Sequence, residues 1–179
     1  MPILRIEGRK HLNNMHTITV LIANSNPRVS NLIYSLVRSI CGADTTVDCT
    51  RVMRVDEFLT EAVRNNFDLI IMNPEDLSAA PDRRRSHAPI RQVVDAIRSV
   101  KTLRSAPIIC VAVSAENELL LSNAGADHVL GLPFGCEDFK AAVSRLLVVP
   151  AEHLEMYAVK PSLAVSLMRG WEKLTESLT

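Results

Sequence analysis

Five short strand-like runs, four of them almost continuously apolar, alternate along the chain with segments whose apolar residues recur at helical spacing. The runs span residues 17–23, 45–52, 69–72, 106–113 and 128–132. Strands that are apolar along their whole length are buried on both faces, and strands that alternate with helices form parallel sheets. Because crossovers between parallel strands are right-handed, helices cover both faces. The sequence therefore predicts an α/β fold with a doubly wound, five-stranded parallel sheet.

The segments between the runs carry helix signals. In the first of them Asn26 suits the N-cap, Pro27 suits the first helical position, and Gly42 can end the helix. The apolar stripe of this helix consists of Val29, Leu32, Ile33, Leu36, Val37 and Ile40. Comparable stripes predict further helices over residues 55–66, 90–100, 114–126 and 136–147.

Length and composition limit the classes of protein to consider. A chain of 179 residues with 47% hydrophobic residues can bury one core of ordinary size. Lys plus Arg equals Asp plus Glu at 20 each, which argues against a dedicated nucleic-acid or anionic-membrane binder. Near-zero net charge also removes a barrier to self-association. We therefore expect a protein partner, a homodimer or both, with nucleic acid and membrane not expected.

The same features predict a cytoplasmic protein. No apolar run approaches the roughly 20 residues of a membrane span, and the N-terminal residues have no continuous apolar h-region. The four cysteines follow no C-x-x-C pattern, so we interpret them as reduced structural thiols. They are Cys41, Cys49, Cys110 and Cys136.

The predicted domain spans residues 17–149, between an N-terminal tail (1–16) and a helical extension (150–179). Beyond Pro161 the extension repeats apolar residues at spacings of three or four, which predicts a terminal amphipathic helix. The repeating residues are Leu163, Leu167, Trp171, Leu174 and Leu178. Their apolar stripe must cover the domain itself, a second subunit or a segment outside this chain.

Motifs that carry enzymatic chemistry are missing from the sequence. The five histidines have no H-x-x-x-H spacing, so a metal site is not expected. Neither a G-x-S-x-G elbow nor a P-loop occurs, and six scattered glycines are too few to cradle a nucleotide. We therefore predict no catalytic residues, no cofactor and no enzymatic activity.

A site in a doubly wound sheet lies beyond the carboxyl ends of its strands. Four pieces lie at these ends: "VLIANSNP" (20–27), "FDLIIMN" (67–73), "APIICVAV" (106–113) and "AGADHVLGLPF" (124–134). In their order and spacing they resemble the receiver domain of bacterial two-component response regulators, over residues 17–149. The resemblance implies the flavodoxin-like, CheY-like fold of that family.

The resemblance implies a phosphorylation site whose parts are all substituted here. The two acids that hold Mg²⁺ in the family correspond to Asn24 and Ser25, and the phosphoacceptor aspartate corresponds to Asn73. The hydroxyl residue that ends the fourth strand becomes Ala112, with Ser114 as an alternative. The conserved lysine of the family becomes Leu132, and the switch aromatic becomes Val129.

These substitutions are chemically consistent with one another. An amide is not a nucleophile, Mg²⁺ needs anionic oxygens, and an unpaired lysine would be costly to bury. We interpret the site as a neutral, partly apolar pocket in a phosphorylation-independent receiver that acts as a protein-interaction module in signal transduction. The alternatives are a sensor of a small quinone-like ligand, a receiver phosphorylated on another acid, a doubly wound domain unrelated to receivers, and a DNA-binding regulator without its output region. The candidate acids are Glu75, Asp76 and Asp82.

Two further surfaces are candidates for contacts. In the family the fourth helix, fifth strand and fifth helix form the partner face, which corresponds to residues 116–147. This segment contains Leu119, Leu120 and Leu121, and three consecutive helical positions cannot all face inward. Trp171 of the terminal helix joins the predicted interface. In the loop after the third predicted strand, Arg83, Arg84 and Arg85 suit an anion or a partner.

Overall fold

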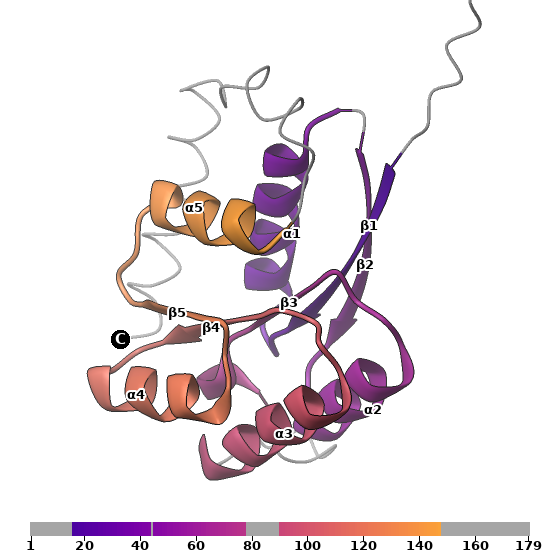
Figure 1. Ribbon diagram of the computed structural model, residues 1–179. Helices are drawn as coiled ribbons and strands as arrows, with labels where there is room; N and C mark the ends of the chain where they lie inside the picture. Colours follow the sequence, from indigo (N-terminus) through magenta and orange to yellow (C-terminus); the bar gives the residue numbers. More distant parts are fainter. Residues whose placement is uncertain (1–15, 44, 78–89, 148–179) are drawn as a thin grey trace, which may run out of the picture.

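The computed structural model describes residues 16–43, 45–77 and 90–147. Five strands and five helices alternate along them (Figure 1). The strands are β1 (His16–Ala23), β2 (Thr45–Val52), β3 (Leu69–Met72), β4 (Ile108–Ala112) and β5 (His128–Gly131). The α-helices are α1 (Pro27–Cys41), α2 (Val55–Arg64), α3 (Ile90–Leu103), α4 (Ala115–Ala124) and α5 (Cys136–Leu146). A 3₁₀ turn, η1 (Pro74–Asp76), follows β3.

The five strands form one parallel sheet in the order β2-β1-β3-β4-β5. The chain changes direction across the sheet after β2, so the right-handed crossover through α1 lies on one face and the crossovers through α2, α3 and α4 lie on the other. Figure 1 shows α1 and α5 on one face of the sheet and α2, α3 and α4 on the other. The predicted doubly wound, flavodoxin-like fold is confirmed.

The sheet separates two apolar cores, one on each face. Leu21, Ile70 and Ile108 pack with α2, α3 and α4, around the fully buried Phe58. Neighbouring strand residues face the other way and pack with α1 and α5, around Phe139. Because successive side chains of a strand point to opposite faces, a strand buried on both faces must be continuously apolar. This two-sided burial explains the apolar runs of the sequence.

Helix boundaries follow the local signals closely. Asn26 caps α1, with its Oδ1 accepting a hydrogen bond from the Arg28 N–H at 3.0 Å. Gly125 ends α4 in the left-handed region at φ 104°, where only glycine is unstrained. β1 begins at His16, one residue earlier than predicted, and α3 extends to Leu103 rather than to residue 100.

The structure differs most from the sequence prediction just after β3. Residues 74–76 were expected to be loop, but they form η1, in which the Asp76 N–H donates to the Asn73 carbonyl at 3.2 Å. Pro74 favours this turn because its fixed φ suits a first helical position. Across residues 16–43, 45–77 and 90–147, no helix has the length and apolar character needed to cross a membrane.

Candidate functional site

The carboxyl ends of β1 and β3 bring Asn24 and Asn73 together. The Asn73 N–H donates to the Ala23 carbonyl at 3.0 Å, which continues the pairing of these strands by one step. Both side chains are buried, with exposed fractions of 1% for Asn24 and 7% for Asn73. Ser25, the next residue after Asn24, is half-buried. The sequence prediction that these residues share one edge of the sheet is therefore correct.

A carboxylate bridges the two amides. The Asp76 Oδ2 atom accepts hydrogen bonds from Nδ2 of Asn73 at 2.7 Å and from Nδ2 of Asn24 at 3.4 Å. The η1 turn makes this contact possible because it brings Asp76 back over the end of β3. Oδ1 of Asn24 accepts from the Asn26 N–H at 2.7 Å, which fixes the orientation of its amide. The prediction of a neutral pocket is wrong on this point, since the site contains an acid.

One polar atom of the site has no hydrogen-bond partner among the described residues. Oδ1 of Asn73 is buried, and the Nδ2 atom of the same amide faces Asp76. A buried acceptor without a donor costs roughly 1–3 kcal/mol of stability. The amide orientation nevertheless follows from its neighbour, because the opposite orientation would place an oxygen against the Asp76 carboxylate.

The second acid of η1 reaches the junction between β4 and α4. Oε1 of Glu75 accepts from the Val113 N–H at 3.1 Å and from Nδ2 of Asn117 at 2.7 Å. Ser114, the alternative hydroxyl residue, is the N-cap of α4, and its Oγ accepts from the Asn117 N–H at 3.2 Å. Glu75 and Asp76 together therefore connect the ends of β1, β3 and β4 through hydrogen bonds.

The remaining residues of the predicted site contribute apolar atoms to this edge. Ala112 ends β4 and is fully buried. The Leu132 N–H donates to the Ala112 carbonyl at 2.8 Å, and the Leu132–Pro133 peptide bond is cis. Val129 is half-buried and packs against the core beneath α4. Neither Leu132 nor Val129 can donate a side-chain hydrogen bond or neutralise an anion.

The predicted interface residues of α4 divide between the surface and the core. Leu119 and Leu120 are exposed to 64% and 38%, whereas Leu121 has an exposed fraction of 0%. Leu121 belongs to the core with Phe58, so its assignment to an interface is corrected. Val113 is also exposed, at 55%. The other candidate contacts lie outside the described residues: Arg83, Arg84, Arg85 and Trp171.

Sequence reasoning listed Glu75 and Asp76 only as alternative phosphoacceptors and missed their hydrogen-bonding role. The signal was present in "NPED", since a proline after a strand-ending residue can start a turn. Such a turn brings the fourth residue, Asp76, back toward the first, Asn73. The partners of these two acids, Asn24 and Val113, are distant in sequence and could not be found from it.

The Mg²⁺ site that the receiver resemblance implies does not fit the residues present. Magnesium needs hard oxygen ligands, usually with one or two carboxylates among them. Here the side-chain N–H groups of Asn24 and Asn73 point at the Asp76 Oδ2 atom. A cation bound to this carboxylate oxygen would face hydrogen-bond donors where it needs oxygen ligands. Within the described ranges there is also no group of three His, Cys, Asp or Glu side chains that could hold a metal ion.

Comparison with known proteins gives a clear answer for the fold alone. No protein-family model and no curated protein match the sequence. One similar solved structure is the receiver domain of a sensor histidine kinase from Pseudomonas aeruginosa, with magnesium in its active-site cleft. It is 20% identical to this chain, with a TM-score of 0.55. The match covers 73% of this chain and 98% of that one.

Two further structures give the same result. A two-component response regulator from Clostridium difficile is 16% identical with a TM-score of 0.55, covering 73% of this chain and 95% of that one. A CheY-like receiver domain protein from Methanospirillum hungatei is 16% identical with a TM-score of 0.56. This match covers 73% of this chain and 94% of that one. The described part of this chain therefore has the receiver-domain fold of two-component response regulators.

Proposed function

We propose that this chain is a receiver-like signalling module that acts through protein contacts and does not depend on phosphorylation. The observation that supports the proposal is the amide of Asn73, which corresponds to the phosphoacceptor in the receiver resemblance and donates to Asp76 at 2.7 Å. Formation of an aspartyl phosphate needs a carboxylate nucleophile, and an amide nitrogen cannot replace it.

The surroundings of Asn73 are unfavourable for a phosphoryl group at this position. Glu75 and Asp76 would repel its negative charge, and Leu132 offers no cation to balance it. Glu75 Oε1 also already accepts from the Val113 N–H, so that donor is engaged. A phosphoryl group would have to displace this hydrogen bond while it approached a like charge.

The two acids are poor alternative acceptors of a phosphoryl group for the same reason. Each carboxylate of Glu75 and Asp76 accepts hydrogen bonds from two donors of neighbouring elements. Phosphorylation would replace these contacts with a larger group. A quinone-like ligand is also less favoured than the sequence implied, because the Asp76 carboxylate makes the site polar.

The surface that would carry the output is formed by α4, β5 and α5. Leu119 and Leu120 lie exposed on α4, and Val113 is exposed just before this helix. Exposed leucines on the helix that the receiver resemblance assigns to the partner face support a contact with another protein there. We further propose that the chain has no enzymatic activity, in line with the missing nucleophile and base motifs of its sequence.

The proposal is tested by incubating the full chain with Mg²⁺ and acetyl phosphate and measuring its intact mass. We expect no added phosphoryl group, whereas a receiver that retains its aspartate and its magnesium ligands should gain one in the same reaction. An adduct that disappears in Asn73→Ala would contradict the central claim. An adduct lost only in Glu75→Gln or Asp76→Asn would instead support phosphorylation on another acid, and would equally overturn the proposal.

A further inference from the structure

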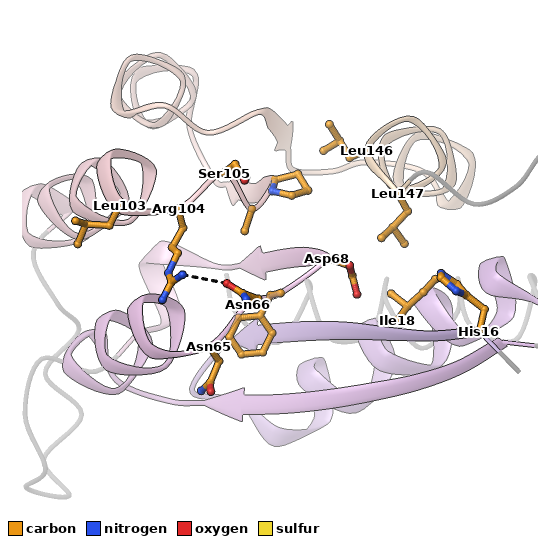
Figure 2. Close-up of a pocket in the computed structure, with 13 residues that line it drawn as sticks. His16, Ile18, Asn65, Asn66, Asp68, Leu103, Arg104, Ser105, Leu146 and Leu147 are labelled. Atoms are coloured by element: carbon orange, nitrogen blue, oxygen red, sulfur yellow. Dashed lines mark hydrogen bonds between the residues drawn. The ribbon is translucent and has the colours of Figure 1, made fainter.

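A cavity of about 610 Å³ lies at the edge of the sheet opposite the candidate site. The residues around it come from the amino-terminal ends of β1, β3 and β4 and from the last residues of α3 and α5 (Figure 2). In doubly wound folds, ligand sites form at the carboxyl ends of the strands. A cavity at the other edge therefore needs a different explanation.

The two ends of the cavity differ in character. Figure 2 shows Ile18, Leu146 and Leu147 around one end, and Arg104 with Asn66 at the other. Asp68 lies between them. Ile18 and Leu147 are already buried, at exposed fractions of 3% and 4%, and Leu146 is half-buried. The apolar area that a covering group would remove from water therefore belongs mainly to Leu146 and to Leu103, which lines the cavity and is 61% exposed. Such burial is favourable by roughly 25 cal/mol per Å².

The charged groups of the cavity are already engaged within the domain. Arg104 donates to the Val63 carbonyl from Nε at 2.9 Å, and to Oδ1 of Asn66 at 3.0 Å. Oδ2 of Asp68 accepts from the N–H and the hydroxyl of Thr19, both at 2.8 Å. These contacts make the cavity a poor site for a small charged ligand, because binding would have to break them.

The chain itself leads to this cavity. Leu147 borders the cavity and is the last described residue before residues 148–179. That segment has a stripe of apolar residues at helical spacing from Leu163 to Leu178, with Trp171 near its middle. A linker from residue 148 to Pro161 can span roughly 40 Å, and a helix over the stripe would be roughly 25 Å long. The segment is therefore long enough to return to the cavity.

We propose that the apolar stripe of residues 163–178 docks on this cavity of its own domain. Tethering favours this occupant, because a short linker gives an effective concentration of about millimolar. A second copy of the chain would have to supply the same stripe from solution. The proposal concerns the edge of the sheet away from α4 and does not depend on the proposed function.

Trp171 is the only tryptophan of the chain, so its fluorescence reports on this segment directly. In the full-length protein we expect emission at a short wavelength and slow quenching by acrylamide, because docking removes the indole from water. Leu103→Glu places a charge at the rim of the cavity, where the leucine is 61% exposed, and Ser105→Glu places one in its lining. Both variants should shift the emission to longer wavelength and speed up the quenching.

The matched control is Leu119→Glu on α4, since Leu119 is 64% exposed and lies outside the cavity lining. This variant should leave the Trp171 emission unchanged. Thermal denaturation should show that all three variants stay folded, as expected for exposed positions. A response to Leu119→Glu without a response to the two cavity variants would place the segment on α4 and overturn the proposal.

Two other outcomes would also overturn it. If Trp171 of the unmodified chain emits and quenches as a fully solvated indole, the segment is not docked. If its emission shifts to longer wavelength on dilution, while light scattering shows a dimer dissociating, the stripe belongs to a contact between two copies. Emission that stays constant across the dilution series supports docking within one chain.

Discussion

At the scale of single residues, Asn73 and Asp76 form the central pair of the candidate site. The Asn73 amide donates to the Asp76 carboxylate, and Asn24 adds a second, longer hydrogen bond to the same oxygen. An aspartate at position 73 would turn this donor into a second acid beside the first. The neutral amide is therefore what this arrangement needs, given the acid at position 76.

Introducing an acid by Asn73→Asp should consequently destabilise the protein. Two neighbouring carboxylates repel each other, and the buried one loses the favourable contact of the amide, so we expect a loss of roughly 1–3 kcal/mol at neutral pH. The loss should be smaller near pH 4, where one of the carboxyls takes up a proton. Chemical denaturation at both pH values measures it.

The double variant Asn73→Asp with Asp76→Asn is the matched control. It exchanges the acid and the amide, so one donor again faces one carboxylate, and most of the lost stability should return. If Asn73→Asp alone is as stable as the unmodified chain at neutral pH, the role assigned to the Asp76 contact is wrong.

At the scale of elements, α4 joins the candidate site to the proposed interaction surface. Its N-terminus is held by the Ser114 cap and by Glu75, which reaches Asn117 from η1. Along the same helix Leu121 enters the core while Leu119 remains outside. The helix is therefore held by the site at its N-terminus and exposes Leu119 and Leu120 to solvent.

If α4 forms the interface of a homodimer, Leu119→Glu should weaken it. A charge at the centre of an apolar contact loses water without gaining a partner, which commonly costs more than 1 kcal/mol of binding free energy. We expect light scattering to show a dimer for the unmodified chain and a shift toward monomer for the variant. The exposed Leu103 supplies the control, because Leu103→Glu should leave the dimer intact. An unmodified chain that is monomeric, or a dimer unaffected by Leu119→Glu, would contradict the assignment.

At the scale of the whole molecule, each core contains one deeply buried cysteine. Cys110 lies in the core under α2, α3 and α4, and Cys41 lies in the core under α1 and α5. Burial raises the pKa of Cys41 from 9.0 to about 11, and burial together with the nearby Asp127 raises the pKa of Cys110. Both thiols therefore stay protonated and shielded while the sheet and its helices are intact.

Labelling with iodoacetamide at pH 8 should follow this difference in burial. Cys49 and Cys136 are only half-buried and should react first, whereas Cys41 and Cys110 should react at the rate of unfolding. Peptide mass mapping over time, with and without denaturant, measures the four rates. Rapid labelling of Cys110 in the native protein would show that its core opens far below the global unfolding free energy.

The raised pKa of Cys41 also sets a direction for stability at alkaline pH. The protonated Cys41 thiol contributes fully to the free energy of unfolding below pH 9. This contribution is lost as the pH rises toward 11, because the thiol loses its proton at lower pH in the unfolded chain than in the folded one. The fold therefore becomes less stable across this window.

Much of the fold could be predicted from the sequence because its signals are local. Continuous apolar runs predicted the buried strands, and Asn26 and Gly42 predicted the two ends of α1. The turn at η1 was missed, because its signal is a single proline after the strand and not a periodic pattern. The three leucines of α4 showed that one must be exposed, but which one depends on the direction of the helix relative to the sheet.

The sequence by itself determined the order of strands and helices, the doubly wound sheet, and the amide at position 73 that excludes an aspartyl phosphate there. Only the tertiary structure decided what surrounds that amide. Asp76 meets Asn24 across 52 residues, and Glu75 meets Val113 across 38. Contacts of this kind depend on how the strands lie side by side, and no local pattern encodes them. Residue identity and periodicity therefore specified the fold, while packing decided the hydrogen bonds of the site and the cavity at the opposite edge of the sheet.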